Sequence, residues 1–251
     1  MITKKPMSRW QAAGIHVGIS VLIGILVALL LFGVWYPPPY FVAGGADHLM
    51  LVLVSVDLVL GPLLTLVVFK AGKWGMKFDL FAIGVFQACA LAYGLHVMAA
   101  SRPVFLVGNL DRFVLVAANE IEDSDLAKGH GDEFRTRSWL GARLAGARIA
   151  DEKARQELIS AAILGKDIQN YPEYFVPYST VTPELLRRAK PLDELRKRRG
   201  ASPVIDGWLQ KSGRQAADIV WLPVTARMAD LSMLMDRASG EPLQALAIDP
   251  W

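Results

Sequence analysis

Residues 15–35 read IHVGISVLIGILVALLLFGVW, a run of 21 residues without Asp, Glu, Lys or Arg. Two further apolar runs of the same length follow at 49–69 and 80–100, and Asp57 is their only charged residue. At about 1.5 Å per residue, a helix of this length crosses a hydrocarbon core of about 30 Å. The first run exceeds the apolar core of a cleaved signal peptide, about 7–15 residues. The sequence therefore predicts three transmembrane helices that persist in the protein, at about 12–35, 49–69 and 79–100.

The orientation of these spans follows from the Lys and Arg of their flanks, because cytoplasmic flanks are enriched in both. The N-terminal tail and the loop 70–79 are basic, whereas the loop 36–48 has no Lys or Arg. We therefore expect a cytoplasmic N-terminus and a periplasmic C-terminal part, in the inner membrane of a bacterium. Trp35, Tyr36 and their aromatic neighbours are expected at the outer membrane interface. The basic residues that set this orientation are Lys4, Lys5, Arg9, Lys70, Lys73 and Lys77.

Composition limits the function. Hydrophobic residues make up 53% of the 251 residues and charged residues only 20%, which excludes a disordered chain. Residues 102–251 contain 21 basic and 21 acidic residues, so they lack the basic surplus needed to bind nucleic acid. The single cysteine, Cys89, excludes an intrachain disulfide and a cysteine-based zinc site.

Residues 102–251 are predicted to form a periplasmic α+β domain with an antiparallel sheet. The Val, Phe and Leu of 103–121 predict two strands joined around Gly108–Asp111, and three apolar runs near the C-terminus predict the remaining strands. Between them we expect a helix over 138–165, broken near Asp151. The other expected segments are an ordered loop at 171–181, helices at 183–189 and 192–199, and strands at 219–224, 229–235 and 243–248.

Sequence signatures of catalysis are absent. The chain contains no H-E-x-x-H, G-x-S-x-G, Walker A or G-x-G-x-x-G motif. His130 is the only histidine after residue 102, and without a second His or Cys it makes at best a weak metal site. We therefore expect no enzyme activity, no metal and no cofactor.

Asp57 is a candidate functional residue, because a carboxyl group inside a membrane is costly and rare. It lies eight residues from the outer end of its span at Leu49, at a depth of about 12 Å. In the third span Tyr93 lies equally deep, and His96 about one turn shallower. We therefore predict a hydrogen bond from Asp57 to Tyr93 or His96. Such a contact either locks the second span to the third or serves a function.

Gly61 and Pro62 follow Asp57 one turn later. Because proline lacks an N–H and clashes with the preceding turn, we expect the second span to bend there. Small residues recur four apart in the spans, as in Gly14 and Gly18, and this spacing lets helix backbones approach closely. It predicts either packing among the three helices or a groove for another protein's membrane helix. Further pairs are Ser20 and Gly24, Gly84 and Ala88, and Ala90 and Gly94.

Several longer motifs are similar to those of one known family. Trp35–Tyr40 reads WYPPPY, Asp57–Thr65 reads DLVLGPLLT, and the chain ends in Asp249–Trp251, DPW. Other matching segments are Met76–Leu80, with Gln87 and Tyr93 after it, Arg102–Phe105, Asp111–Phe113, Tyr174–Tyr178 and Trp221–Val224. Over essentially its whole length the chain resembles the type IV pilin accessory protein family of the TfpX/TfpZ type, from Gram-negative bacteria.

The resemblance implies a non-enzymatic, chaperone-like and pilin-specific factor of type IV pilus biogenesis. Such proteins act on the major pilin in the inner membrane and aid its stability or assembly. That pilin has one membrane helix and an outward head, so we expect both halves of this chain to contact it. The pilin helix carries an acid near its cytoplasmic end, at a depth similar to that of His16. His16 is therefore either a contact for that acid or a residue satisfied within the bundle.

The main alternative is a subunit of an inner-membrane transport or sensor complex that uses Asp57 to relay protons. In either case the expected partners are membrane lipid and another protein. The candidate partner-binding or structural residues are Asp57, Gly61, Pro62, Tyr93, His96, His16, Gly14, Gly18, Trp35 and Tyr36.

Overall fold

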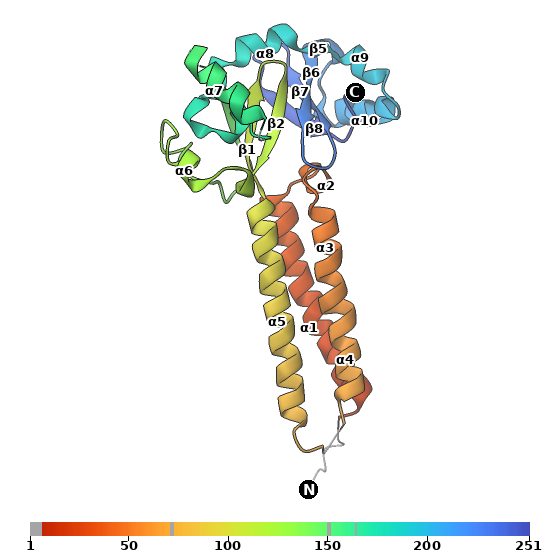
Figure 1. Ribbon diagram of the computed structural model, residues 1–251. Helices are drawn as coiled ribbons and strands as arrows, with labels where there is room; N and C mark the ends of the chain where they lie inside the picture. Colours follow the sequence, from red (N-terminus) through yellow and green to blue (C-terminus); the bar gives the residue numbers. More distant parts are fainter. Residues whose placement is uncertain (1–6, 71–72, 150–151, 164) are drawn as a thin grey trace. The chain divides into compact units, whose positions relative to one another are not determined.

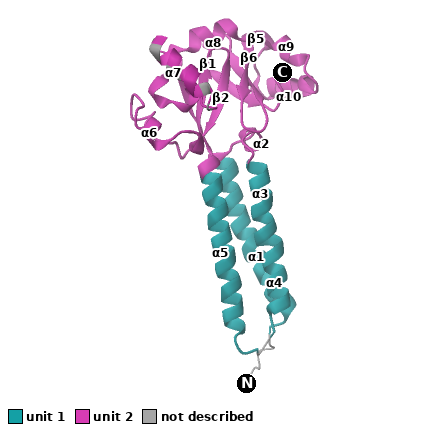
Figure 2. Cartoon of the chain, in the orientation of Figure 1, with its two compact units in different colours: residues 1–33, 46–99 teal, residues 34–45, 100–251 magenta. Residues whose placement is uncertain are grey.

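The computed structural model describes residues 7–70, 73–149, 152–163 and 165–251. Lys4 and Lys5, used in the orientation argument, and Asp151, the expected helix break, lie outside these residues. The chain divides into two compact units, coloured in Figure 2. We call residues 1–33 and 46–99 the helical unit, and residues 34–45 and 100–251 the sheet unit.

The helical unit contains the three expected helices, which run side by side in Figure 1. Length and composition make each a candidate membrane span. Ser8 begins the first helix with a capping box, in which its side chain and that of Gln11 pair with each other's backbone N–H groups. The elements are α1 (Arg9–Leu30), the π-helical turn η1 (Leu31–Trp35), α3 (Ala46–Val54), the π-helical turn η2 (Ser55–Leu60), α4 (Gly61–Val68) and α5 (Met76–Ser101).

Many large apolar side chains of the helical unit are exposed, unlike those of a water-soluble bundle. Large apolar residues such as Leu22, Val67 and Phe81 are exposed, while the polar Ser20 and Thr65 are buried. Exposed apolar surface on all three helices would be unfavourable in water. The three helices are therefore suited to a lipid environment, as the sequence predicts.

The sheet unit is built on a mixed eight-stranded sheet, in the order β4-β3-β1-β2-β6-β7-β8, with β5 paired to β6. Most pairs are antiparallel, as expected, but β1–β3 and β2–β6 are parallel. The expected hairpin is confirmed as β1 and β2, and the three C-terminal strands as β6, β7 and β8. Strand bounds are β1 (Pro103–Asn109), β2 (Arg112–Ala117), β3 (Arg143–Ala147), β4 (Phe175–Val176), β5 (Lys190–Pro191), β6 (Ile219–Thr225), β7 (Leu231–Asp236) and β8 (Pro242–Leu246).

Helices cover both faces of this sheet because β6 is apolar on both sides. Leu222 belongs to the buried cluster that contains Leu185 of α8, whereas Trp221 belongs to the cluster of α9 and α10. Adjacent strand residues point to opposite faces. The expected helices at 183–189 and 192–199 are confirmed as α8 (Thr182–Arg188) and α9 (Leu192–Arg196); α6 (Asp123–Leu126) and α10 (Ala201–Ser212) were not expected.

The expected helix over 138–165 is wrong in its first part. Residues Arg143–Ala147 form β3, and the helix α7 covers Glu152–Ala162. Gly146 pairs with Gly108 of β1 and Val176 of β4. A Cβ at Gly146 would lie 2.6 Å from Val181 Cγ2, so this strand depends on close packing against Val181. The helical pattern of apolar residues, on which the prediction was based, carries no information about such packing.

The segment 34–45 differs from the sequence-based boundary, which assigned it to the membrane half. It folds as part of the sheet unit. Ala43, in the short helix α2 (Tyr40–Ala43), is fully buried in the cluster of Leu106 and Leu222. Its carbonyl accepts a hydrogen bond of 2.9 Å from the Met228 N–H. The connection between the first two spans is thus an integral part of the sheet unit.

We predict that Gly146→Ala lowers the stability of the sheet unit by about 1–3 kcal/mol, because the added methyl group overlaps Val181. Thermal unfolding of the detergent-solubilised full chain, followed by near-UV circular dichroism, measures the change. Gly207→Ala in α10 is the matched control, since a Cβ there meets nothing within 4 Å. Equal midpoints for the two variants would contradict the packing described here.

Candidate functional site in the helical unit

Three polar side chains from three helices meet in the helical unit. His16 comes from α1, Thr65 from α4 and Gln87 from α5. His16 Nδ1 lies 2.6 Å from Thr65 Oγ1, and His16 Nε2 lies 2.6 Å from Gln87 Oε1. Thr65 is only 2% exposed. Because interhelical hydrogen bonds in lipid contribute about 0.6–2 kcal/mol each, these contacts hold α5 to α1 and α4.

Gln87 also supplies a hydrogen-bond donor that the backbone of the second span lacks. The Gly61 N–H bonds to the Val56 carbonyl, five residues back, so it does not serve the Asp57 carbonyl. The next residue, Pro62, has no N–H to offer. Gln87 Nε2 donates to this Asp57 carbonyl oxygen at 3.3 Å. We call His16, Thr65, Gln87 and the Asp57 carbonyl the intramembrane polar cluster.

Gly61 leaves the space that the Gln87 amide occupies. A Cβ at Gly61 would lie 1.9 Å from Gln87 Nε2, so any larger residue displaces the amide from the Asp57 carbonyl. The expected irregularity at Gly61–Pro62 takes the form of the π-helical turn η2. At its start the Ser55 hydroxyl donates to the Leu51 carbonyl at 2.7 Å, a contact that loosens regular helix.

The orientation of Gln87 fixes the role of one ring nitrogen of His16. Because Gln87 points its amide nitrogen at the Asp57 carbonyl, its oxygen faces His16. His16 Nε2 therefore donates to Gln87, whereas His16 Nδ1 lies within hydrogen-bond distance of the Thr65 hydroxyl, which can either donate or accept. Of the two roles expected for His16, the contacts favour satisfaction within the bundle.

The expected hydrogen bond from Asp57 to Tyr93 or His96 is wrong. Tyr93 is 72% exposed, His96 is exposed, and no hydrogen bond joins either to Asp57 in the described helices. The rise per residue gives the position of a side chain along the helix axis but not its direction around that axis. Gln87 faces the bundle, and at about 100° per residue Tyr93 lies about 120° away from it and His96 about 180°.

The Asp57 side chain lines a groove between α1 and α5 of about 440 Å³. Gly84 and Ala88, one of the predicted small-residue pairs, line the groove on α5. Its other lining residues are mostly apolar, with His16, Thr65 and Gln87 among the exceptions. The groove therefore offers apolar walls and a polar floor within the candidate spans.

The other small residues have different surroundings. Gly94 packs tightly, since a Cβ there would lie 2.4 Å from Leu53 Cδ1. Gly14 and Gly18 are exposed on α1, and a Cβ at either meets nothing within 4 Å. The Gly94 contact joins α5 to α3, whereas no described residue covers the Gly14–Gly18 face of α1.

Trp35 and Tyr36 are buried in the sheet unit, which corrects the expectation that Tyr36 lies in an interfacial aromatic belt. Tyr36 is completely buried, and burial raises its pKa far above the usual range. Burial likewise raises the pKa of Tyr40 to about 12. Trp35 contacts Trp139, with ring centroids 6.0 Å apart.

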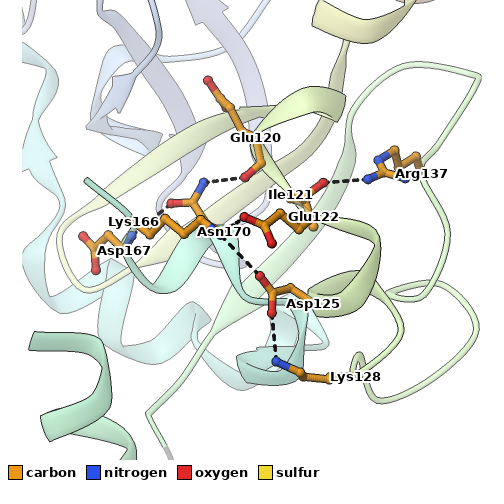
Figure 3. A network of polar contacts seen from close by, with 9 residues as sticks. All are labelled: Glu120, Ile121, Glu122, Asp125, Lys128, Arg137, Lys166, Asp167 and Asn170. Carbon is orange, nitrogen blue, oxygen red and sulfur yellow. Dashed lines mark hydrogen bonds and ion pairs between the residues drawn. The ribbon is translucent and has the colours of Figure 1, made fainter. Parts of the chain in front are cut away.

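A second polar cluster lies in the sheet unit (Figure 3). Asp125 is buried and pairs with Lys128 at 2.8 Å and Lys166 at 3.6 Å; Lys166 also bonds to Glu122. The side-chain bond to Asp125 raises the pKa of Lys128, and the bond to Glu122 that of Lys166. Asn170 Nδ2 donates to the Glu120 carbonyl at 3.1 Å. These groups satisfy one another and tie residues 120–128 to 166–170, so we assign them a structural role.

Among the described residues, no three His, Cys, Asp or Glu side chains are grouped so that they could hold a metal ion. His130 is exposed in its loop.

Two members of the intramembrane polar cluster, Thr65 and Gln87, are absent from the candidate residues of the sequence analysis. A signal for them existed. Asp57, Gly61 and Thr65 are spaced four apart and therefore share one helix face, and Gln87 is the one amide side chain of the third apolar run.

Fold and site together define a protein with three candidate membrane spans, linked by buried polar contacts, and a separate α+β unit. The family model described as "Fimbrial assembly protein FimB" matches residues 4–45. Two fimbrial assembly proteins of Dichelobacter nodosus, of serogroups I and E1, are each 29% identical over 233 residues, covering 90% of both chains. A third, of serogroups C1 and C2, is 32% identical over 113 residues, covering 44% of this chain and 86% of the relative. No solved structure matches.

The chain therefore belongs to the fimbrial assembly protein family, and the predicted resemblance to type IV pilus accessory proteins is confirmed. The matched segment 4–45 includes both α1, with His16, and the connection that folds into the sheet unit.

We predict that Gly61→Ala destabilises the helical unit by about 1–3 kcal/mol, because displacing Gln87 removes two interhelical hydrogen bonds. Equilibrium unfolding in mixed micelles with increasing dodecyl sulfate measures this. Gly14→Ala is the control, with no neighbour for its methyl group. If Gln87→Leu and Gly61→Ala are fully additive, the two residues do not act through one contact.

Proposed function

We propose that this chain is a non-enzymatic accessory protein of type IV pilus biogenesis that binds the major pilin in the inner membrane as a chaperone-like factor. The names of its relatives support an assembly role: all three are fimbrial assembly proteins. The three candidate spans support a location in the membrane.

The observation that carries the proposal is the groove between α1 and α5. Lipid tails are as apolar as the groove walls, so a membrane helix gains affinity there from close packing and hydrogen bonds rather than from hydrophobicity. Gly84 and Ala88 permit close backbone approach on one wall, and the Asp57 side chain lines the same groove. These are the properties that a single apolar helix, such as that of a pilin, needs in order to dock.

The proposed orientation has the N-terminus in the cytoplasm and the sheet unit in the periplasm. The basic flanks Arg9, Lys70, Lys73 and Lys77 support it by the positive-inside rule. The sheet unit would then lie on the same side of the membrane as a pilin head, and two contacts on one tethered partner reinforce each other through effective concentration.

One observation favours a second candidate, a subunit of a transport or sensor complex. Asp57 lines the groove, and no hydrogen bond joins its side chain to another described residue, so its carboxyl group is open to take up and release a proton. Asp57→Asn separates the candidates: normal piliation with loss of an ion-coupled activity would assign the chain to such a complex.

We predict that Gly84→Leu lowers the recovery of major pilin with the tagged, detergent-solubilised chain, because the larger side chain fills the groove. A loss of about 1.4 kcal/mol weakens affinity roughly tenfold. The matched variant Gly18→Leu leaves recovery unchanged, since Gly18 does not line the groove.

Loss of pilin with Gly18→Leu alone would move the docking face to the Gly14–Gly18 side of α1. Absence of pilin from the wild-type preparation, together with normal piliation in a deletion strain, would contradict the proposed function itself.

A further inference from the structure

Two consecutive large apolar side chains of the sheet unit point into the surroundings. Trp139 is 60% exposed and Leu140 is 86% exposed. They follow Ser138 in a loop that leads into β3. An adjacent exposed Trp and Leu leave more apolar surface in water than the scattered single residues normal for soluble domains.

This loop is fixed by contacts to residues at the ends of two candidate spans. The Trp139 ring lies 6.0 Å from the ring of Trp35, and the Arg102 guanidinium carbon lies 3.9 Å from the Trp139 ring centroid. Arg102 Nε also donates to the Ser138 carbonyl at 3.1 Å. The loop therefore has a defined position relative to Trp35 and Arg102.

Those two residues lie at the ends of candidate spans. Trp35 is the last residue of the first candidate span, and Arg102 directly follows the third, which ends at Ser101. Tryptophan is enriched at membrane–water interfaces, and because Trp35 and Arg102 are themselves buried, Trp139 is the exposed member of this group. A side chain in contact with both lies close to the ends of these spans.

We propose that Trp139 and Leu140 insert into the interface between lipid headgroups and acyl chains, as an additional membrane contact of the sheet unit. The indole then occupies the headgroup level, with its apolar face against lipid and the Arg102 charge beside it. Leu140 reaches the acyl boundary. Lipid is favoured over a protein partner because both residues that hold Trp139 lie at or directly after the ends of candidate spans, so the exposed Trp139 ring is close to the span ends.

A spin-label measurement tests this insertion. Cys89 is the only cysteine, so Cys89→Ser permits a single nitroxide at Leu140→Cys in the full chain. The protein is placed in nanodiscs of phosphatidylethanolamine and phosphatidylglycerol, and the collision rates of the label with oxygen and with a water-soluble nickel complex are compared. Leu110→Cys is the control, because Leu110 is 55% exposed directly after the far end of β1, eight residues beyond Arg102.

We expect the label at Leu140 to collide more with oxygen and less with nickel than the label at Leu110, as for a residue at the headgroup level. Adding Trp139→Ser should move the Leu140 label toward water while the far-UV spectrum stays unchanged. Nickel access at Leu140 equal to that at Leu110 would overturn the proposal. So would protection that arises only when pilin is added, since that would assign the patch to a protein partner.

Discussion

A backbone carbonyl inside a membrane needs a hydrogen-bond donor from the protein, because lipid offers none. Pro62 removes such a donor from the second span, and η2 moves the Gly61 N–H to Val56. The Asp57 carbonyl then depends on Gln87, which reaches it from another helix at 3.3 Å. The missing backbone donor of the second span is thus replaced by a hydrogen bond from the third.

This contact explains why the residues of the segment DLVLGPLLT occur together. Asp57 supplies the carbonyl, Gly61 the space for the Gln87 amide, Pro62 the missing N–H, and Thr65 the hydroxyl for His16. His16 then connects Thr65 and Gln87, so that three helices share one chain of hydrogen bonds. The groove beside this chain is where a partner helix would meet both its apolar walls and the Asp57 carboxyl group.

Much of the architecture was predictable from the sequence, because it depends on hydrophobicity along the chain. The three spans, the first hairpin and the C-terminal strands all follow from runs of apolar residues.

The candidate site was predicted only in part. The candidate residues Asp57, Gly61, Pro62 and His16 belong to the intramembrane polar cluster or lie beside it. Tyr93 and His96, in contrast, point away from Gln87 around α5. The rise per residue gives the depth of a side chain along the helix axis. Its direction around that axis depends on which face the helix presents to its neighbours.

The sequence did not predict the placement of the segment 34–45 or of β3, because both depend on contacts between residues distant in sequence. Examples are Met228 with Ala43 and Gly146 with Val181.

The most direct test of the central claim is a double-mutant cycle on Pro62 and Gln87, measured by equilibrium unfolding in mixed micelles. Pro62→Ala restores a backbone N–H to the second span, and that span then no longer needs the amide. We predict that Gln87→Leu costs about 1–3 kcal/mol in the natural chain and at least about 0.6 kcal/mol less in the Pro62→Ala background. The His16 bond accounts for the cost that remains. An equal cost in both backgrounds would show that Gln87 does not replace the donor that Pro62 lacks.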